Sequence, residues 1–232
     1  QIAQVALWLM DHQMNLRVAE QFGEYFARLP LKKSPTVVNG NALRIEWSDI
    51  IQPSELTCIL GNPPFVGKKE QSPDQKQDMA TVFGGTKGTG VLDFVAAWYL
   101  KAARYIQNTQ VRCAFVSTSS ITQGEQVGVL WSTLQPLKIR IHFAHRTFKW
   151  TSEARGRAAV HCVIIGFGAS LPSTALLADY ETPDSEPQFT VVKSINPYLV
   201  DGPFVLLTNR SNPIGPAPEL SYGSFALDDG NY

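Results

Sequence analysis

The stretch Cys58-Ile59-Leu60-Gly61-Asn62-Pro63-Pro64-Phe65 decides the fold, because a short apolar run ends there at two consecutive prolines. Residues 57–60 are β-branched or apolar, and the length of the run suits a buried strand. Two prolines cannot continue a strand or a helix, and each holds the residue before it in an extended conformation. Asn62 is therefore expected in a rigid turn at the carboxyl end of a strand, the edge of an open α/β sheet where ligands bind.

The residue types in this turn suit the binding of a flat amine. The side-chain carbonyl of Asn62 and the main-chain carbonyl of Pro63 can each accept a hydrogen bond from an exocyclic amino group. Such bonds draw the nitrogen lone pair out of conjugation with the ring and toward an electrophile. The ring of Phe65 then offers a face on which a base can stack.

The tetrapeptide Asn62-Pro63-Pro64-Phe65 resembles the catalytic motif of S-adenosylmethionine-dependent amino-methyltransferases, (D/N/S)PP(Y/F/W). Enzymes that share this motif act on DNA adenine, on ribosomal RNA guanine or on protein glutamine, so the tetrapeptide alone leaves the substrate open. The structural alternative is an ordinary Pro-Pro loop.

Composition describes an ordinary globular chain without a charge bias. Its 232 residues are enough for one α/β domain with a sizeable core. Lys and Arg together number 20, as do Asp and Glu, so any surface for nucleic acid has to be local. No apolar run is long enough to span a bilayer, and we expect no membrane contact.

The three cysteines, Cys58, Cys113 and Cys162, lie in separate apolar runs. We expect them to be reduced, buried thiols of a cytoplasmic protein. The cysteines lack metal-ligand spacing. His142, His145 and His161 are close in sequence, but His142 should face outward on one strand and His161 lies in another, so no bound metal is expected.

Hydrophobic periodicity predicts an α/β order of elements around the turn. We expect helices over residues 2–29, 92–107 and 122–134, strands over residues 36–38, 57–60, 111–117, 138–144 and 159–167, a turn over 39–43, and a long loop over 66–90. In the strand 138–144, Ile139, Ile141 and Phe143 should face inward. Thr122 and Glu125 fit a capping box for the last helix. This order predicts a mostly parallel sheet that finishes in an antiparallel hairpin.

Six stretches together resemble successive motifs of the class I S-adenosylmethionine fold. The resemblance is closest to MmeI-like bacterial DNA adenine methyltransferases of the fused restriction-modification kind. The stretches are ALWL at 6–9, NPPFVGKK at 62–69, LDFVAAWY at 92–99, FVST at 115–118, QGEQVG at 123–128 and FAHRTF at 143–148. The resemblance implies an α/β, Rossmann-like methyltransferase sheet that is partial because its N-terminal strands are missing.

Prolines interrupt every pattern after residue 168, and only residues 189–192 and 204–207 look like short strands. Under the resemblance, residues 1–168 would be the C-terminal part of a methyltransferase catalytic domain. Residues 169–232 would be a proline-rich connector toward an absent target-recognition domain.

The same resemblance implies roles for single residues. Asn62 to Phe65 would hold and stack the target adenine. Asn41, with Ala42, matches the place where relatives set an acidic or amide side chain near the adenine of S-adenosylmethionine, although a simple turn asparagine explains Asn41 equally well. Phe148 would stack on the other face of the flipped base, and Trp150 is the alternative.

Double-stranded DNA is the partner that the resemblance implies. An adenine amine is buried in the duplex, so the base has to be flipped out of the stack. Several basic side chains would then contact phosphates, namely Lys68, Lys69, Arg146, Lys149 and Arg155. For Arg155 the alternative is a solvated hairpin tip.

The start of the chain lies inside a helix that, in such enzymes, follows the glycine-rich cofactor loop. We therefore expect a piece of a longer polypeptide whose upstream part supplies the main S-adenosylmethionine site, so that this piece alone binds the donor weakly or not at all. The alternatives in function are a protein-glutamine or RNA amino-methyltransferase, and a DNA-binding module that keeps the fold without catalysis.

Overall fold

A computed structural model describes residues 2–23, 35–150, 160–182, 185–208 and 215–216. The chain divides into two compact units, Gln1–Ile45 and Glu46–Tyr232. The first unit contains helix α1 (Ile2–Phe22), which ends where Gly23 adopts a φ of 71°, a conformation that favours glycine. The predicted continuation over residues 24–29 lies outside the described residues. The strand predicted at 36–38 is wrong, because these residues pair with no described strand.

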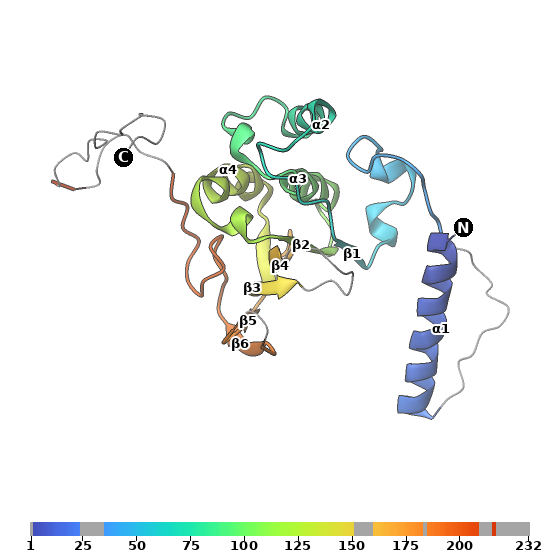
Figure 1. The fold of residues 1–232 in the computed structure, drawn as a ribbon. Helices are drawn as coiled ribbons and strands as arrows, with labels where there is room; N and C mark the ends of the chain where they lie inside the picture. The colour runs from blue at the N-terminus through green and yellow to red at the C-terminus, as the bar shows by residue number, and fades with distance from the viewer. Residues whose placement is uncertain (1, 24–34, 151–159, 183–184, 209–214, 217–232) are drawn as a thin grey trace, which may run out of the picture. The chain divides into compact units, whose positions relative to one another are not determined.

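A six-stranded sheet with the order β1-β2-β4-β3-β5-β6 is the frame of the second unit (Figure 1). The strands are β1 (Cys58–Gly61), β2 (Arg112–Thr118), β3 (Arg140–Trp150), β4 (Val160–Gly168), β5 (Ala175–Asp179) and β6 (Gln188–Val192). Strands β1, β2, β3 and β5 run in one direction, and β4 and β6 run in the other. The sheet is therefore mixed, with most strands sharing one direction as predicted, and β3–β4 is the predicted hairpin. That hairpin does not finish the sheet, because β5 and β6 follow it.

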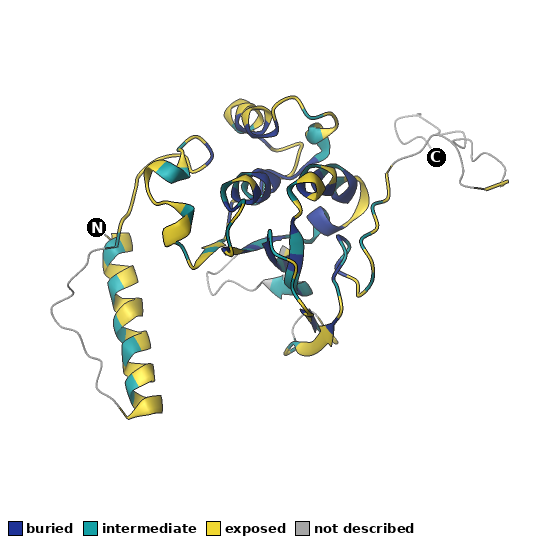
Figure 2. Cartoon of the chain, turned by 180° about the vertical axis from the view of Figure 1, so that it is seen from behind, coloured by how far each residue is buried: buried dark blue, intermediate teal, exposed yellow. Residues whose placement is uncertain are grey.

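The core lies between the sheet and the helices α3 (Ala96–Tyr105) and α4 (Gly124–Leu134), where Figure 2 shows the buried residues gathered. Tyr99 of α3 is 1% exposed, and its ring stacks on Phe167 of β4 with the centroids 5.2 Å apart. The same ring meets Phe115 of β2 edge-on at 5.3 Å, and its hydroxyl is 2.7 Å from the hydroxyl oxygen of Ser117. These contacts fix α3 against the middle of the sheet.

Helix α2 (Pro73–Phe83) occupies part of the stretch that was predicted as one long loop, 66–90. The Ser72 hydroxyl accepts a hydrogen bond from the Gln75 backbone N–H at 3.2 Å, and the Gln75 side chain accepts one from the Ser72 N–H at 2.9 Å. Pro73 stands in the first turn, and Gly84 ends the helix with a φ of 56°. Ser72, the proline after it and Gln75 three residues later have the pattern of a helix start. The many Lys and Gly residues of the segment 66–90 favoured a loop prediction instead.

The capping box predicted at Thr122 and Glu125 is wrong. Thr122 belongs to a short 3-10 turn (Ser119–Thr122), where its hydroxyl donates to the Ser119 carbonyl at 2.8 Å. Helix α4 begins two residues later, at Gly124, after Gln123. The hydroxyl is therefore used by the turn that leads from β2 into the helix.

Strand β3 is longer than predicted and irregular. It continues to Trp150, and its register with β4 shifts between Ile141 and Phe143. This irregularity breaks the simple alternation, so Ile139 and Ile141 are buried as predicted while Phe143 is only half-buried.

Strand β1 explains the one wrong prediction about the thiols. Cys113 and Cys162 are buried free cysteines, but Cys58 is exposed. Strand β1 pairs with β2 alone among the described strands, so its other edge is uncovered in this part of the chain. Leu60 of the same strand is 74% exposed.

Beyond residue 168 the chain still contributes to the sheet. Strand β6 matches the prediction at 189–192, whereas β5 was not predicted and residues 204–207 form no strand. Phe204 instead meets Trp131 of α4 edge-on, with the ring centroids 6.1 Å apart. Among the helices that the structure describes, none is long and apolar enough to cross a membrane.

Candidate active site

The Asn62-Pro63-Pro64-Phe65 turn leaves the sheet directly after β1. Pro63 is buried, Asn62 is exposed and Phe65 is half-buried. In the described part of the chain, no residue forms a hydrogen bond with the Asn62 side-chain amide, so its carbonyl oxygen is available as an acceptor. The buried proline fixes the backbone beneath an amide that faces outward.

Gly61 brings the end of β1 close to the core. A Cβ atom on Gly61 would lie 3.1 Å from two ring carbons of Phe115, the residue opposite it on β2. The Phe115 ring is itself 2% exposed and packed against Tyr99 and Phe167. A side chain at this position would require the ring to shift by a few tenths of an ångström, so glycine allows the strand to end close to the core, directly before Asn62.

Asp93 holds the chain immediately after the turn, although it lies 27 residues further along the sequence. Its Oδ1 accepts hydrogen bonds from the backbone N–H groups of Val66 at 3.3 Å and Val95 at 3.1 Å. Its Oδ2 accepts from the Thr118 hydroxyl at 3.3 Å, and its own N–H donates to Gln126 Oε1 at 2.8 Å. The end of the turn, the end of β2 and helix α4 are thus joined through one residue.

The carboxyl group of Asp93 is almost inaccessible, with the residue 4% exposed. Burial raises its pKa above the ordinary value, while the hydrogen bonds from Val95, Val66 and Thr118 act in the opposite direction. A buried carboxyl group with three donors is arranged to hold neighbouring segments.

The carbonyl of Val66 is held as firmly as its N–H. It accepts hydrogen bonds from the Phe94 N–H at 3.0 Å and from the Gln71 side-chain amide at 3.3 Å. The Gln71 amide is 8% exposed and also donates to the Leu92 carbonyl at 2.9 Å. Asp93 lies in the stretch 92–99 that resembles the family, but no role is predicted for Asp93 or Gln71 from the sequence, because their partners are distant along the chain.

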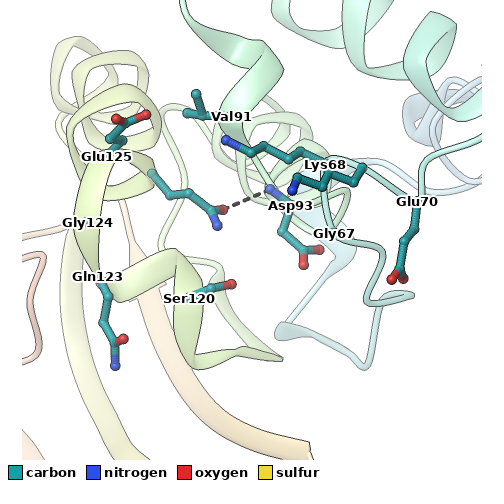
Figure 3. A pocket seen from close by; sticks show the side chains of 11 residues that line it. Gly67, Lys68, Glu70, Val91, Asp93, Ser120, Gln123, Gly124 and Glu125 are labelled. Carbon is teal, nitrogen blue, oxygen red and sulfur yellow. Dashed lines mark hydrogen bonds between the residues drawn. The ribbon is translucent and has the colours of Figure 1, made fainter. Parts of the chain in front are cut away.

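A cleft of about 680 Å³ opens beside the segment that follows the turn (Figure 3). The residues that line it are Gly67, Lys68, Lys69, Glu70, Val91, Asp93, Ser120, Gln123, Gly124, Glu125 and Gln126. Lys68 and Lys69 bring positive charge to the cleft, whereas Glu70 and Glu125 bring negative charge. The cleft therefore presents polar groups of both signs next to the predicted catalytic residues.

Phe148 lies toward the carboxyl ends of the parallel strands β1 and β2, the end of the sheet from which the turn leaves. It pairs with Cys162 of β4, and Cys162 pairs with Thr118, the last residue of β2. Its ring stacks on Tyr180, with the centroids 5.4 Å apart and the planes inclined by 27°. The Tyr180 hydroxyl is hydrogen bonded to His145 Nδ1 at 2.7 Å. The side chain of Trp150, the alternative stacking residue, lies outside the described part of the structure.

Arg146, predicted to contact phosphate, is engaged within the protein. Its Nη1 forms an ion pair with Asp179 Oδ2 at 2.7 Å, and its Nε donates to the Leu199 carbonyl at 2.8 Å. These contacts join β3 to the end of β5 and to the segment that follows β6. The side chain is 36% exposed, so part of the guanidinium remains accessible.

The other predicted phosphate contacts are distributed over two places. Lys68 and Lys69 are exposed beside the cleft, and Lys149 is half-buried on β3. Arg155 lies outside the described residues. Their role toward DNA stays a prediction.

Asn41 and Ala42 are exposed in the first unit, at a turn that agrees with the predicted turn. The Asn41 side-chain oxygen accepts from the Leu43 N–H at 2.9 Å, and its carbonyl accepts from the N–H groups of Arg44 and Ile45. Asn41 is therefore a turn asparagine. Its role toward a cofactor stays a prediction.

No group of three or more His, Cys, Asp or Glu side chains among the described residues could hold a metal ion.

Comparison with known proteins gives this arrangement a family. The family model described as MmeI, DNA-methyltransferase domain, matches residues 1–178. The chain belongs to this family.

Two relatives are similar to this MmeI-family chain along its length. It is 38% identical over 232 residues to DNA methyltransferase A of Bacillus subtilis (strain 168), covering 99% of this chain and 26% of the relative. It is 56% identical to the Type IIL restriction-modification enzyme MmeI, solved in complex with DNA, with a TM-score of 0.87 over all of this chain and 31% of the other. The MmeI-family chain thus spans about a quarter to a third of the length of these relatives.

Proposed function

We propose that the full-length protein is an S-adenosylmethionine-dependent DNA adenine methyltransferase of a restriction-modification enzyme, and that residues 62–65 carry the chemistry. The observation that supports this most directly is the turn itself. Asn62 presents an exposed amide without a partner in the described chain, directly before the buried Pro63, in a family named for DNA methyltransferase activity.

The chain's own groups are suited to polarising an amine. The Asn62 side-chain carbonyl and the Pro63 main-chain carbonyl each accept a hydrogen bond from one N–H of the adenine amino group, which leaves the nitrogen lone pair directed away from the ring. Phe65 contacts the face of the base. The rate gain comes from positioning the amine and from polarising it, so no covalent enzyme intermediate is required.

S-adenosylmethionine, when bound, supplies the electrophilic methyl group. We propose that Asn41 and Ala42 contact its adenine, because they lie exposed at a turn where the hydrogen bond from the Leu43 N–H keeps the Asn41 side chain oriented. We propose that the rest of the donor site lies in sequence outside residues 1–232, as the fraction of the relatives that this chain covers suggests.

Double-stranded DNA is the proposed partner, with the target adenine flipped toward residues 62–65. Unstacking a base costs a few kcal/mol, which stacking on Phe65 and Phe148 partly offsets. Lys68 and Lys69, both exposed beside the motif, are placed to meet phosphates. None of the three cysteines follows a proline, which argues against the Pro-Cys chemistry of cytosine C5 methylation.

The proposal is tested by nucleoside mass spectrometry on duplex DNA incubated with S-adenosylmethionine and the full-length protein. We expect N6-methyladenine from the wild type and a loss of at least about 100-fold in the Asn62→Ala variant, since the substitution removes an acceptor aimed at the reacting amine. Asn15→Ala, which makes the same replacement at a half-buried asparagine of α1, is the matched control and should retain activity. Methylcytosine as the product, or no methylated base at all, would refute the adenine assignment.

A further inference from the structure

We propose that Asp93 is a positioning residue for methyl transfer, which holds the catalytic turn at its carboxyl end. The inference rests on the function proposed above. Val66 follows Phe65 directly in the sequence, so a bond to its backbone limits the movement of the whole Asn62–Phe65 turn. Asp93 supplies that bond through Oδ1, at 3.3 Å from the Val66 nitrogen.

The other hydrogen bonds of Asp93 connect the turn to packed elements of the second unit. The Val95 N–H bonds to the same Oδ1, the Thr118 hydroxyl bonds to Oδ2, and Gln126 accepts from the Asp93 N–H. We call Asp93 together with Val66 and these three partners the Asp93 anchor. It joins the turn to the end of β2 and to helices α3 and α4, all of which belong to the packed part of the second unit.

Burial explains why this anchor is expected to be strong. Asp93 is 4% exposed, so water cannot replace a lost partner at low cost. Both carboxylate oxygens are engaged by protein donors, which leaves Asp93 to act through the turn and not on the substrate. Figure 3 shows Asp93 on the wall of the cleft, with its N–H bonded to Gln126.

Four substitutions at this anchor remove different numbers of the side-chain hydrogen bonds of Asp93. Asp93→Asn keeps an Oδ1 acceptor for Val66 and Val95 and places an amide donor where Oδ2 was. The Thr118 hydroxyl can accept that donor, because it is also 2.9 Å from the Ser120 hydroxyl and can direct its proton there. Asp93→Ala removes every side-chain bond. Thr118→Val, nearly isosteric, removes one bond to Oδ2, and Thr118→Ser retains it.

The first measurement does not depend on activity. Hydrogen exchange at the Val66 amide and trypsin cleavage after the exposed Lys68 and Lys69 report whether the turn is held. We expect both to be about 10- to 100-fold faster in full-length Asp93→Ala than in the wild type, intermediate in Thr118→Val, and within about threefold of the wild type in Asp93→Asn and Thr118→Ser. Equal exchange and cleavage in the wild type and Asp93→Ala would overturn the anchor.

The second measurement is steady-state methylation by the same variants. Misplacement of a reacting group by about 1 Å costs about 100-fold in rate, so kcat should fall about 10- to 100-fold in Asp93→Ala, while KM for DNA and for the donor changes less than about threefold. Asp93→Asn should restore most of kcat. A loosened turn with wild-type kcat, or a loss in Asp93→Asn equal to that in Asp93→Ala, would overturn the positioning role. If the wild type does not methylate DNA, the proposed function and the positioning role are both refuted. Hydrogen exchange at the Val66 amide would still show whether Asp93 holds the turn.

Discussion

The ring of Phe148 on β3 rests on the ring of Tyr180, which follows β5 directly, at a centroid distance of 5.4 Å. Tyr180 is held at its other end by the hydrogen bond to His145. If Phe148 stacks on the flipped base, Tyr180 supports it from behind. We expect Tyr180→Ala to slow single-turnover methylation about two- to twelvefold, since an aromatic pair contributes about 0.5–1.5 kcal/mol.

Tyr180→Phe is the matched control for that prediction. It keeps the stacked ring and removes only the hydroxyl, so the rate should stay within about twofold of the wild type. Equal losses in both variants would assign the effect to the hydrogen bond with His145 and not to the ring.

Gly61→Ala should destabilise the second unit by about 1–3 kcal/mol, the usual cost of overpacking. The new methyl group would lie 3.1 Å from the Phe115 ring, which neighbouring aromatic rings hold in place. Denaturant unfolding measures the difference. Gly67→Ala is the control, because a Cβ there meets nothing within 4 Å. A Gly61→Ala variant as stable as the control would show that the ring can move aside.

Thiol labelling should distinguish the three cysteines of the purified 232-residue chain. Cys58 is exposed and should react within the dead time of a conventional assay, while Cys113 and Cys162 are buried. Burial raises the pKa of Cys113 to about 12, so its reactive thiolate is scarce at neutral pH. Mass spectrometry after a short pulse of iodoacetamide should find the label on Cys58 alone. Comparable labelling of Cys113 would contradict the packing of β2.

Stability should fall on acidification in part because of His145. Burial lowers its pKa in the folded state, so the unfolded chain takes up a proton at a higher pH than the folded chain does. The contribution of His145 to stability is complete above about pH 6.5 and is lost as the pH falls from there toward the lowered folded pKa. Unfolding free energies at pH 7.5 and 5.5 should therefore differ less in His145→Asn than in the wild type. An unchanged difference would contradict this.

The sequence was sufficient for features that depend on neighbouring residues. The two prolines after Leu60 stop β1 wherever it packs, and the apolar runs around Phe115 and Ile165 form strands because they are buried on the helix-covered side of the sheet. The helix before Ile106 follows from its spacing of apolar residues.

The sequence did not predict features that depend on residues far apart in the chain. Asp93 and Gln71 acquire their roles from backbone groups that only the fold brings close, and polar residues in an apolar stretch give no sign of which groups they will meet. Cys58 is exposed because β1 lies at an edge of the sheet. A short apolar run in the sequence has the same pattern whether its strand lies at an edge or in the centre.

The insertion of β4 between β2 and β3 has a consequence for the order in which the protein assembles. Arg112 of β2 and Arg140 of β3 both pair with Gly168, so these two strands are bridged by a strand that leaves the ribosome after both. Joining segments so far apart in sequence requires closure of a long loop, which slows folding. The nascent chain therefore cannot join β2 to β3 until β4 has been synthesised, so the turn after β1 and the ring of Phe148 become parts of one sheet only late in translation.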